Sequence, residues 1–309
     1  MNEWITLFAI YLALFLFGMT VLRHGLMVRF RSSLPEILTR FVDRPWKGLI
    51  AGTLVATVVQ SSSAVMVITV GLVAAGILSF KHSVGIMLGA NIGTVATLEI
   101  LAYDLSSFIM PCLVIGVILL FSKTENNFAL GCLFFGFATM IVAMQGFESL
   151  AYPLSSIPSV YNWFTSTSDN SHIGILAGII LSSVIQSSSV VTAMAMSFMN
   201  EHILGLPAAI SIMLGANIGT CITAWFASFG GSKEAKLTAY AHIWVNIIGV
   251  LLILPFIDWF SAIVSLTSPS PAQQLAHAAF LFNAASSLLF LPFAGHLAYI
   301  VQKIHGHIR

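Results

Sequence analysis

The sequence contains one tetrapeptide twice, as Gln60-Ser61-Ser62-Ser63 and as Gln186-Ser187-Ser188-Ser189, at an offset of 126 residues in a chain of 309. The same nine residues, Ile-Met-Leu-Gly-Ala-Asn-Ile-Gly-Thr, follow each copy at the same offset. Between these landmarks residues 48–97 align without a gap with residues 174–223, and 21 of the 50 positions are identical. Similarity at a fixed spacing indicates repeated structural units. We therefore predict one repeat over 1–126, a second over 127–257, and a C-terminal helix and tail over 258–309.

The composition of the chain is that of a membrane protein. Apolar residues make up 58% of it and charged residues 7%, against roughly 25% charged residues in soluble proteins. A helix needs about 20 apolar residues to cross a bilayer. Because 12 basic residues are balanced by 11 acidic ones, no nucleic-acid partner is expected. The three cysteines have no metal-ligand or disulfide spacing. The fold class predicted is an all-α integral membrane protein.

Each QSSS interrupts an apolar stretch, at 46–79 and 172–203. The arms on either side are only about 12–16 residues long, too short to cross the bilayer singly. We therefore predict two re-entrant helical hairpins with QSSS at their tips. Full spans are expected at 4–22, 83–103 and 107–121 in the first repeat, at 128–148, 207–229 and 237–257 in the second, and at 274–301 near the C-terminus.

Charge placement supports opposite orientations for the two repeats. Three crossings in each repeat would invert the second relative to the first. With the linker 23–47 in the cytoplasm, all 12 Lys and Arg residues fall on the cytoplasmic side, as the positive-inside rule requires. This predicts a multi-pass protein of the plasma membrane with its N-terminus outside and its C-terminus inside. It also predicts that no basic side chain reaches the hairpin tips.

The polar tips are the main candidate binding groups. A serine hydroxyl donates and accepts hydrogen bonds, and a glutamine offers a carbonyl oxygen and an amide. The tips can therefore hold a cation through oxygens and an oxyanion through hydrogens, aided by the positive end of the returning helix. The simpler alternative is that the serines only cap helices. Two copies in inverted repeats favour a shared site near the membrane midplane, and its candidate residues are Gln60, Ser61, Ser62, Ser63, Gln186, Ser187, Ser188 and Ser189.

The motif Gly-Ala-Asn-Ile-Gly-Thr supplies a second group of candidates. Its glycines recur every four residues, as expected for close helix packing. The asparagine and threonine face away from that stripe on an intact helix and need partners inside a membrane. A hairpin tip or an ion would serve, which makes Asn91, Thr94, Asn217 and Thr220 candidates.

Three further polar residues are candidates for a supporting role. His242 and Asn246 lie four residues apart and so share one face of the 237–257 helix. Asn283 ends a similar pattern 37 residues later. Hydrogen bonding between helices and direct ligand contact are both open for them. Glu99 is an acidic residue within a predicted span. It could be a ligand of a cation site, or it could be solvated at the membrane interface.

Paired QSSS segments, each followed by a G-x-N-I-G-T helix, resemble the sodium/phosphate cotransporter family, meaning the type II sodium-dependent phosphate transporters and their short bacterial relatives. Residues 239–249, Ala-Tyr-Ala-His-Ile-Trp-Val-Asn-Ile-Ile-Gly, are similar to that family's A-x-x-H-x-x-F-N-x-x-G segment, and residues 274–293 resemble a second copy. Val245 and Ala279 depart from the pattern. The resemblance covers about 46–301.

The resemblance implies inverted repeats with re-entrant hairpins and sodium-coupled symport of inorganic phosphate by alternating access. Phosphate, sodium ions and the lipid bilayer are then the partners, Na+ is the coupling ion, and no cofactor is needed. The implied sodium sites share the Gln, Ser, Asn and Thr residues named above. With no basic side chain at the tips, bound sodium would have to balance the anion.

Two other interpretations stay open at this point. The same fold could carry another small oxyanion or export phosphate. A QSSS serine with His242 as its base could instead form an intramembrane serine hydrolase, although the G-x-S-x-G elbow of such enzymes is missing. We expect a transporter and not an enzyme, and the sequence leaves its oligomeric state open.

Overall fold

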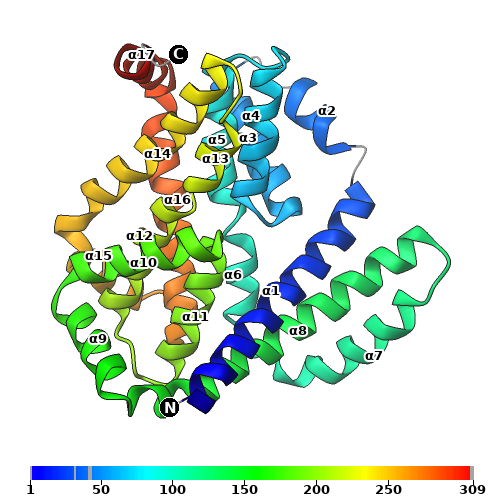
Figure 1. Ribbon diagram of the computed structural model, residues 1–309, viewed down its shortest axis with the longest axis vertical. Helices are drawn as coiled ribbons and strands as arrows, with labels where there is room; N and C mark the ends of the chain where they lie inside the picture. The colour runs from blue at the N-terminus through cyan, green and yellow to red at the C-terminus, as the bar shows by residue number, and fades with distance from the viewer. Residues whose placement is uncertain (1, 31–32, 41–43, 307–309) are drawn as a thin grey trace.

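The computed structural model describes residues 2–30, 33–40 and 44–306. Within these ranges the chain forms helices joined by turns, with no strand, which confirms the all-α class (Figure 1). Arg31, Arg309 and the last residues of the predicted tail lie outside the described residues.

Six helical segments among the described residues are long and apolar enough to cross a membrane. Several consist of two helices separated by a short break. The six are α1 (Asn2–Phe30), α5 (Phe80–Gly93) with α6 (Ala96–Leu101), α8 (Glu125–Ser155), α12 (Leu206–Gly219) with α13 (Ile222–Ala227), α14 (Lys233–Ile253) with η2 (Leu254–Phe256) and α15 (Ile257–Ser265), and α16 (Pro271–Phe290) with η3 (Leu291–Phe293) and α17 (Ala294–His305). All six coincide with predicted spans. The predicted span over 107–121 corresponds to η1 (Ser106–Phe108) and α7 (Ile109–Leu120). Together they form an apolar helical segment that is shorter than the six spans named above.

Both QSSS copies form the same sharp turn between two short helices. The first separates α3 (Pro45–Val59) from α4 (Ser62–Ala74), and the second separates α10 (Ser171–Ile185) from α11 (Ser188–Asn200). Gln60 (φ 55°, ψ 31°) and Gln186 (φ 59°, ψ 29°) end the first helix of each pair in the left-handed region. The predicted interruption is confirmed in both copies, while re-entry into the membrane stays a prediction.

The two repeats pack in the same register. A Cβ on Gly89 of α5 would lie 2.0 Å from the carbonyl oxygen of Leu49 on α3. A Cβ on Gly215 of α12 would lie 2.0 Å from the carbonyl oxygen of Ile175 on α10, which is the equivalent position. The glycine stripe therefore brings helix backbones into direct contact, as predicted.

The first helix is longer than its sequence suggested. The predicted span ended at residue 22 because arginine and histidine follow, but α1 continues to Phe30 and packs along α8. Arg23, assigned above to a cytoplasmic linker, is therefore part of the first membrane helix. α2 (Ser33–Arg40) precedes the first hairpin, and α9 (Pro158–Asp169) precedes the second with a bend of 119° into α10.

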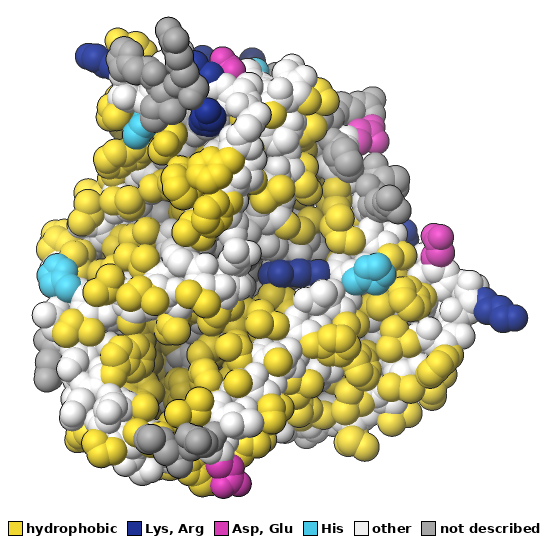
Figure 2. Space-filling model, in the orientation of Figure 1, with side chains coloured by type: hydrophobic (Ala, Val, Ile, Leu, Met, Phe, Trp, Pro, Cys, Tyr) yellow, Lys and Arg dark blue, Asp and Glu magenta, His cyan; other side chains and the backbone are white. Residues whose placement is uncertain are grey.

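The helix arrangement leaves a mostly apolar surface. Figure 2 shows a face dominated by hydrophobic side chains, with many of the charged side chains near its edges. Such a surface suits the interior of a bilayer, where an exposed polar group is costly. The start of α1 and the end of α17 lie at opposite ends of the molecule (Figure 1).

Candidate functional site

The two tips differ in how their serines are used. The hydroxyl of Ser61 accepts a hydrogen bond from the backbone N–H of Ala64 at 3.1 Å and so caps α4. Ser187 holds the same position before α11 but makes no side-chain cap. Capping therefore accounts for one serine of the first tip and for neither of the next two residues, Ser62 and Ser63.

A small polar cavity joins residues of both repeats. Its volume is about 10 Å³, close to the space that a single water molecule needs. Ser62 and Ser188, the first residues of α4 and α11, both line it. Two helix N-termini thus meet one cavity, an arrangement suited to an anion. The predicted residues that line it are Ser62, Asn91, Thr94, Ser188, Ser189, Asn217 and Asn283.

Asn91 is held from behind by α14. Nε2 of His242 lies 3.3 Å from Oδ1 of Asn91, and the Asn91 amide donates to Oδ1 of Asn246 at 3.5 Å. Asn246 in turn donates to the carbonyl oxygen of His242 at 2.9 Å. Both α14 side chains are at most 4% exposed, and neither lines the cavity. His242 and Asn246 therefore contact Asn91 and not the cavity, whereas Asn283 lines the cavity directly.

The remaining predicted residues lie around this cavity without lining it. Gln60 lines a neighbouring cavity, also of about 10 Å³, together with Thr97 and Ser189. Gln186 is exposed and Ser63 is half-buried. The hydroxyl of Thr220 lies 2.6 Å from that of Ser182 on α10 and so is directed to a neighbouring helix.

Two threonines that the sequence reading missed take part in these cavities. The hydroxyl of Thr97 is buried without a hydrogen-bond partner among the described residues. Its identity with Thr223 in the second repeat was a usable signal. Thr192 lines the main cavity but aligns with Met66, so the repeat gave no signal for it.

The prediction that no basic side chain reaches a tip is wrong. Nε and Nη2 of Arg23 donate hydrogen bonds to the backbone carbonyl oxygen of Gln60, at 3.1 and 2.7 Å. The error follows from the length of α1, which carries Arg23 along the first hairpin instead of into a linker. The first tip therefore has a positive charge beside it.

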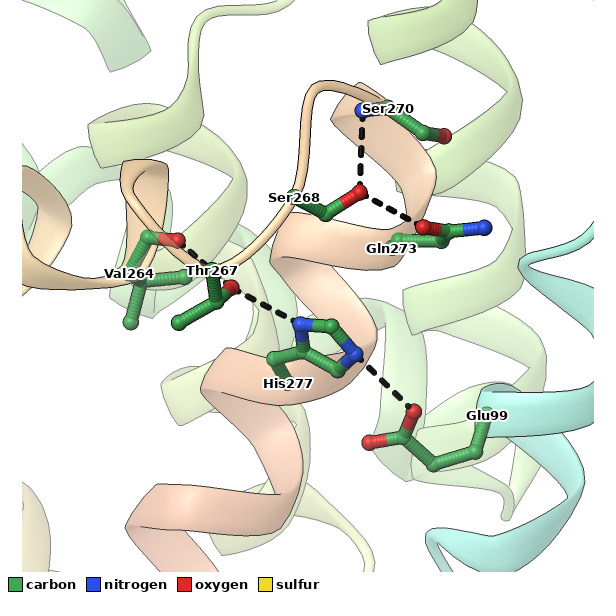
Figure 3. A network of polar contacts seen from close by, with 7 residues as sticks. All are labelled: Glu99, Val264, Thr267, Ser268, Ser270, Gln273 and His277. Atoms are coloured by element: carbon green, nitrogen blue, oxygen red, sulfur yellow. Dashed lines mark hydrogen bonds and ion pairs between the residues drawn. The ribbon is translucent and has the colours of Figure 1, made fainter.

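Glu99 lies outside the polar cavity. Its Oε2 is 3.5 Å from Nε2 of His277 on α16, and Nδ1 of His277 lies 2.7 Å from the hydroxyl of Thr267 (Figure 3). The two side chains of the pair are 30% and 28% exposed. This contact joins α6 of the first repeat to α16 of the C-terminal region.

Larger cavities lie at the two ends of the span formed by α5 and α6. One, of about 520 Å³, is lined by Ser79, Lys81 and residues of α14 and α17. The other, of about 360 Å³, is lined by Asp104 and Glu148, among others. Asn91 and Thr94 lie on this span between them. Hydrogen bonds from the hydroxyl and the amide of Ser106 hold the pKa of the exposed Asp104 carboxyl below its ordinary value.

Broken helices from two sequence repeats that meet at a buried polar cavity define a membrane transport protein. The chain belongs to the Na+/Pi-cotransporter family, which matches residues 14–149 and 155–267. This confirms the resemblance seen in the sequence and makes the protein a member of a transporter family, not of an enzyme family.

The chain is similar to curated proteins of several organisms. It is 40% identical over 285 residues to "Uncharacterized protein YqeW" of Bacillus subtilis, covering 92% of this chain and 93% of that protein. It is 26% identical over 294 residues to "Putative inorganic phosphate export protein YjbB" of Escherichia coli, covering 94% of this chain but 54% of YjbB. It is 30% identical over 131 residues to human "Sodium-dependent phosphate transport protein 2B", covering 40% of this chain and 19% of that protein. No solved structure matches the chain.

Proposed function

We propose that this protein is a secondary active transporter that moves inorganic phosphate together with sodium by alternating access. The observation that carries the proposal is the polar cavity at which the N-termini of α4 and α11 meet. Helix N-termini and hydroxyl groups suit an oxyanion. Amide and hydroxyl oxygens of the same residues suit Na+, which is a hard cation and the proposed coupling ion. No cofactor is needed for this proposal.

The proposed topology follows from the repeats and the charges. The units 1–126 and 127–257 are inverted relative to each other, each with a re-entrant hairpin, and the C-terminal helix and tail occupy 258–309. The protein lies in the plasma membrane, with its N-terminus outside the cell and its C-terminus in the cytoplasm. The larger cavities at the two ends of the α5–α6 span support a path on each side of the central site.

Alternating access also accounts for the small size of the central cavity. A volume of about 10 Å³ has room for about one water molecule and none for phosphate. Binding therefore requires the two tips to separate. Opening on one side and then on the other would connect the site with each larger cavity in turn.

Phosphate efflux is a second candidate. Its support is the similarity to YjbB, which covers 94% of this chain and whose printed name describes phosphate export. Efflux would use the same cavity and differ in the direction of net flow. Another small oxyanion, such as sulfate, could use the same hydroxyl and amide groups.

The test is transport by purified protein in proteoliposomes. Radiolabelled phosphate should accumulate when an inward sodium gradient is imposed, and replacing sodium with choline should abolish the accumulation. Reversing the gradient should drive labelled phosphate out of preloaded vesicles. Accumulation that is equal in sodium and in choline would exclude sodium coupling. Sodium-dependent accumulation of labelled sulfate but not of labelled phosphate would show that the transported anion is a different one.

A further inference from the structure

Arg23 is a charged residue within a helix that is apolar enough to cross the membrane. The side chain is half-buried, and its guanidinium donates two hydrogen bonds to the carbonyl oxygen of Gln60. A charge within a membrane helix is costly, so it calls for a partner or a functional role.

The simplest role for Arg23 would be that of a helix cap. Gln60 ends α3, and a cation at the C-terminal end of a helix is favourable. Gln186, however, ends α10 in almost the same conformation. At the repeat offset of 126, the residue equivalent to Arg23 is Ser149. The Ser149 hydroxyl donates a hydrogen bond to the carbonyl oxygen of Gly146 in its own helix at 2.7 Å. The second copy of the turn is thus made without an arginine at this position, so the turn itself does not require one.

The contact places the charge on the backbone of Gln60, which is itself a candidate site residue. The Gln60 side chain lines the smaller cavity with Ser189, and Ser189 also lines the main polar cavity. The Oε1 atom of Gln60 is buried there and has no hydrogen-bond partner among the described residues. A positive charge beside Gln60 raises the electrostatic potential at a site with little water to screen it.

We propose that Arg23 is a built-in cation of the transport site. At the first tip it supplies positive charge that the second tip, with Ser149 in the equivalent position, has to obtain from bound sodium. This inference rests on the proposed function, because it assumes that an anion binds between the tips. It makes the two repeats unequal in their need for sodium.

The test is equilibrium binding of phosphate to purified protein over a range of sodium concentrations, with thermal unfolding measured in parallel. Arg23→Gln should weaken phosphate binding about tenfold at saturating sodium and should raise the sodium concentration needed for half-maximal binding. Arg23→Lys keeps the charge but loses the two-donor fork, so most of the affinity should return. Arg29→Gln removes an exposed charge from the same helix and should leave both quantities unchanged.

If Arg23→Gln does not fold, Arg23→His allows the charge to be changed within one variant, because histidine becomes protonated between pH 8 and pH 6. Its phosphate affinity should rise over that interval by more than that of the wild type. Wild-type affinity in Arg23→Gln, or a pH response in Arg23→His equal to that of the wild type, would show that Arg23 is only a cap. Failure of the wild type to bind phosphate would instead contradict the proposed function, and the inference with it.

Discussion

At the scale of single residues, identical sequence does not give identical roles. Thr94 and Thr220 occupy equivalent positions, yet Thr94 lines the cavity and Thr220 pairs with Ser182. The difference comes from the facing helix, where the first repeat has Ala56 in place of Ser182. The repeat pattern could predict which residue types approach the site, but not which hydroxyls would be free to reach a ligand.

Substitutions of serines at the two tips should separate phosphate binding from helix capping. Ser62→Ala and Ser188→Ala each remove a hydroxyl from the cavity, and each should weaken phosphate binding about ten- to a hundredfold, the effect of one lost hydrogen bond to a charged ligand. Ser61→Ala removes a cap instead. It should lower the free energy of unfolding by about 1 kcal/mol and leave phosphate affinity nearly unchanged. Binding assays on the three purified variants, together with their thermal unfolding, check this. Normal affinity in both cavity variants would reduce QSSS to a structural turn.

The α14 residues behind Asn91 offer a second test at this scale. His242→Ala removes the contact to Oδ1 of Asn91 without removing a group that lines the cavity. The freed Asn91 should sample other rotamers, so phosphate affinity should fall by less than in Asn91→Ala. Equilibrium binding on both variants gives the order, and a larger loss in His242→Ala would indicate direct ligand contact by the histidine.

At the scale of helices, backbone contact between α3 and α5 and between α10 and α12 fixes the hairpins. The sequence spacing of the glycines predicted this packing. It did not predict the end of α1, because an arginine after an apolar run is usually a sign that the helix has left the membrane. Here the carbonyl of Gln60 receives the charge, and that partner is 37 residues away in the sequence.

Gly89→Ala and Gly215→Ala should therefore destabilise the protein to a similar degree. Each new methyl group would lie 2.0 Å from a backbone oxygen, and a backbone carbonyl cannot move aside without shifting its helix. Gly71→Ala is the matched control, since no atom lies within 4 Å of its Cβ position. Thermal unfolding in detergent should show a clear loss for the first two variants and none for the control. Equal stability of all three would contradict the packing described here.

At the scale of the whole molecule, the main structural prediction is the inverted arrangement of the repeats. Sequence patterning gave six of the described spans and the interruption at each QSSS. The helix predicted over 107–121 is present as η1 and α7, but it is shorter than the other six, so its crossing of the membrane stays a prediction. The sequence could not show how small the central cavity is, because that size depends on contacts between residues of both repeats.

Cysteine labelling tests the arrangement directly. After replacement of the native Cys112, Cys132 and Cys221, single cysteines at Trp46 and Ser79 should react with an impermeant reagent from the cytoplasmic side only. Cysteines at His172 and His202 should react only from outside, because the second hairpin is inverted. Labelling of the two positions of either pair from opposite sides would mean that the hairpin crosses the membrane.

The most direct measurement of the central claim, one site shared by phosphate and sodium, is the mutual dependence of their binding to purified protein. Arg23 and two helix ends of about half a charge each add up to about the two charges of a phosphate dianion, but Arg23 is bound to the backbone of Gln60 and does not line the polar cavity. Inside the cavity only the two helix ends face the anion, and about one charge of the dianion is left for bound sodium to balance. Phosphate affinity should therefore fall steeply when sodium is replaced by choline. By linkage, phosphate should strengthen sodium binding by the same factor. Equal phosphate affinity with and without sodium would contradict the account.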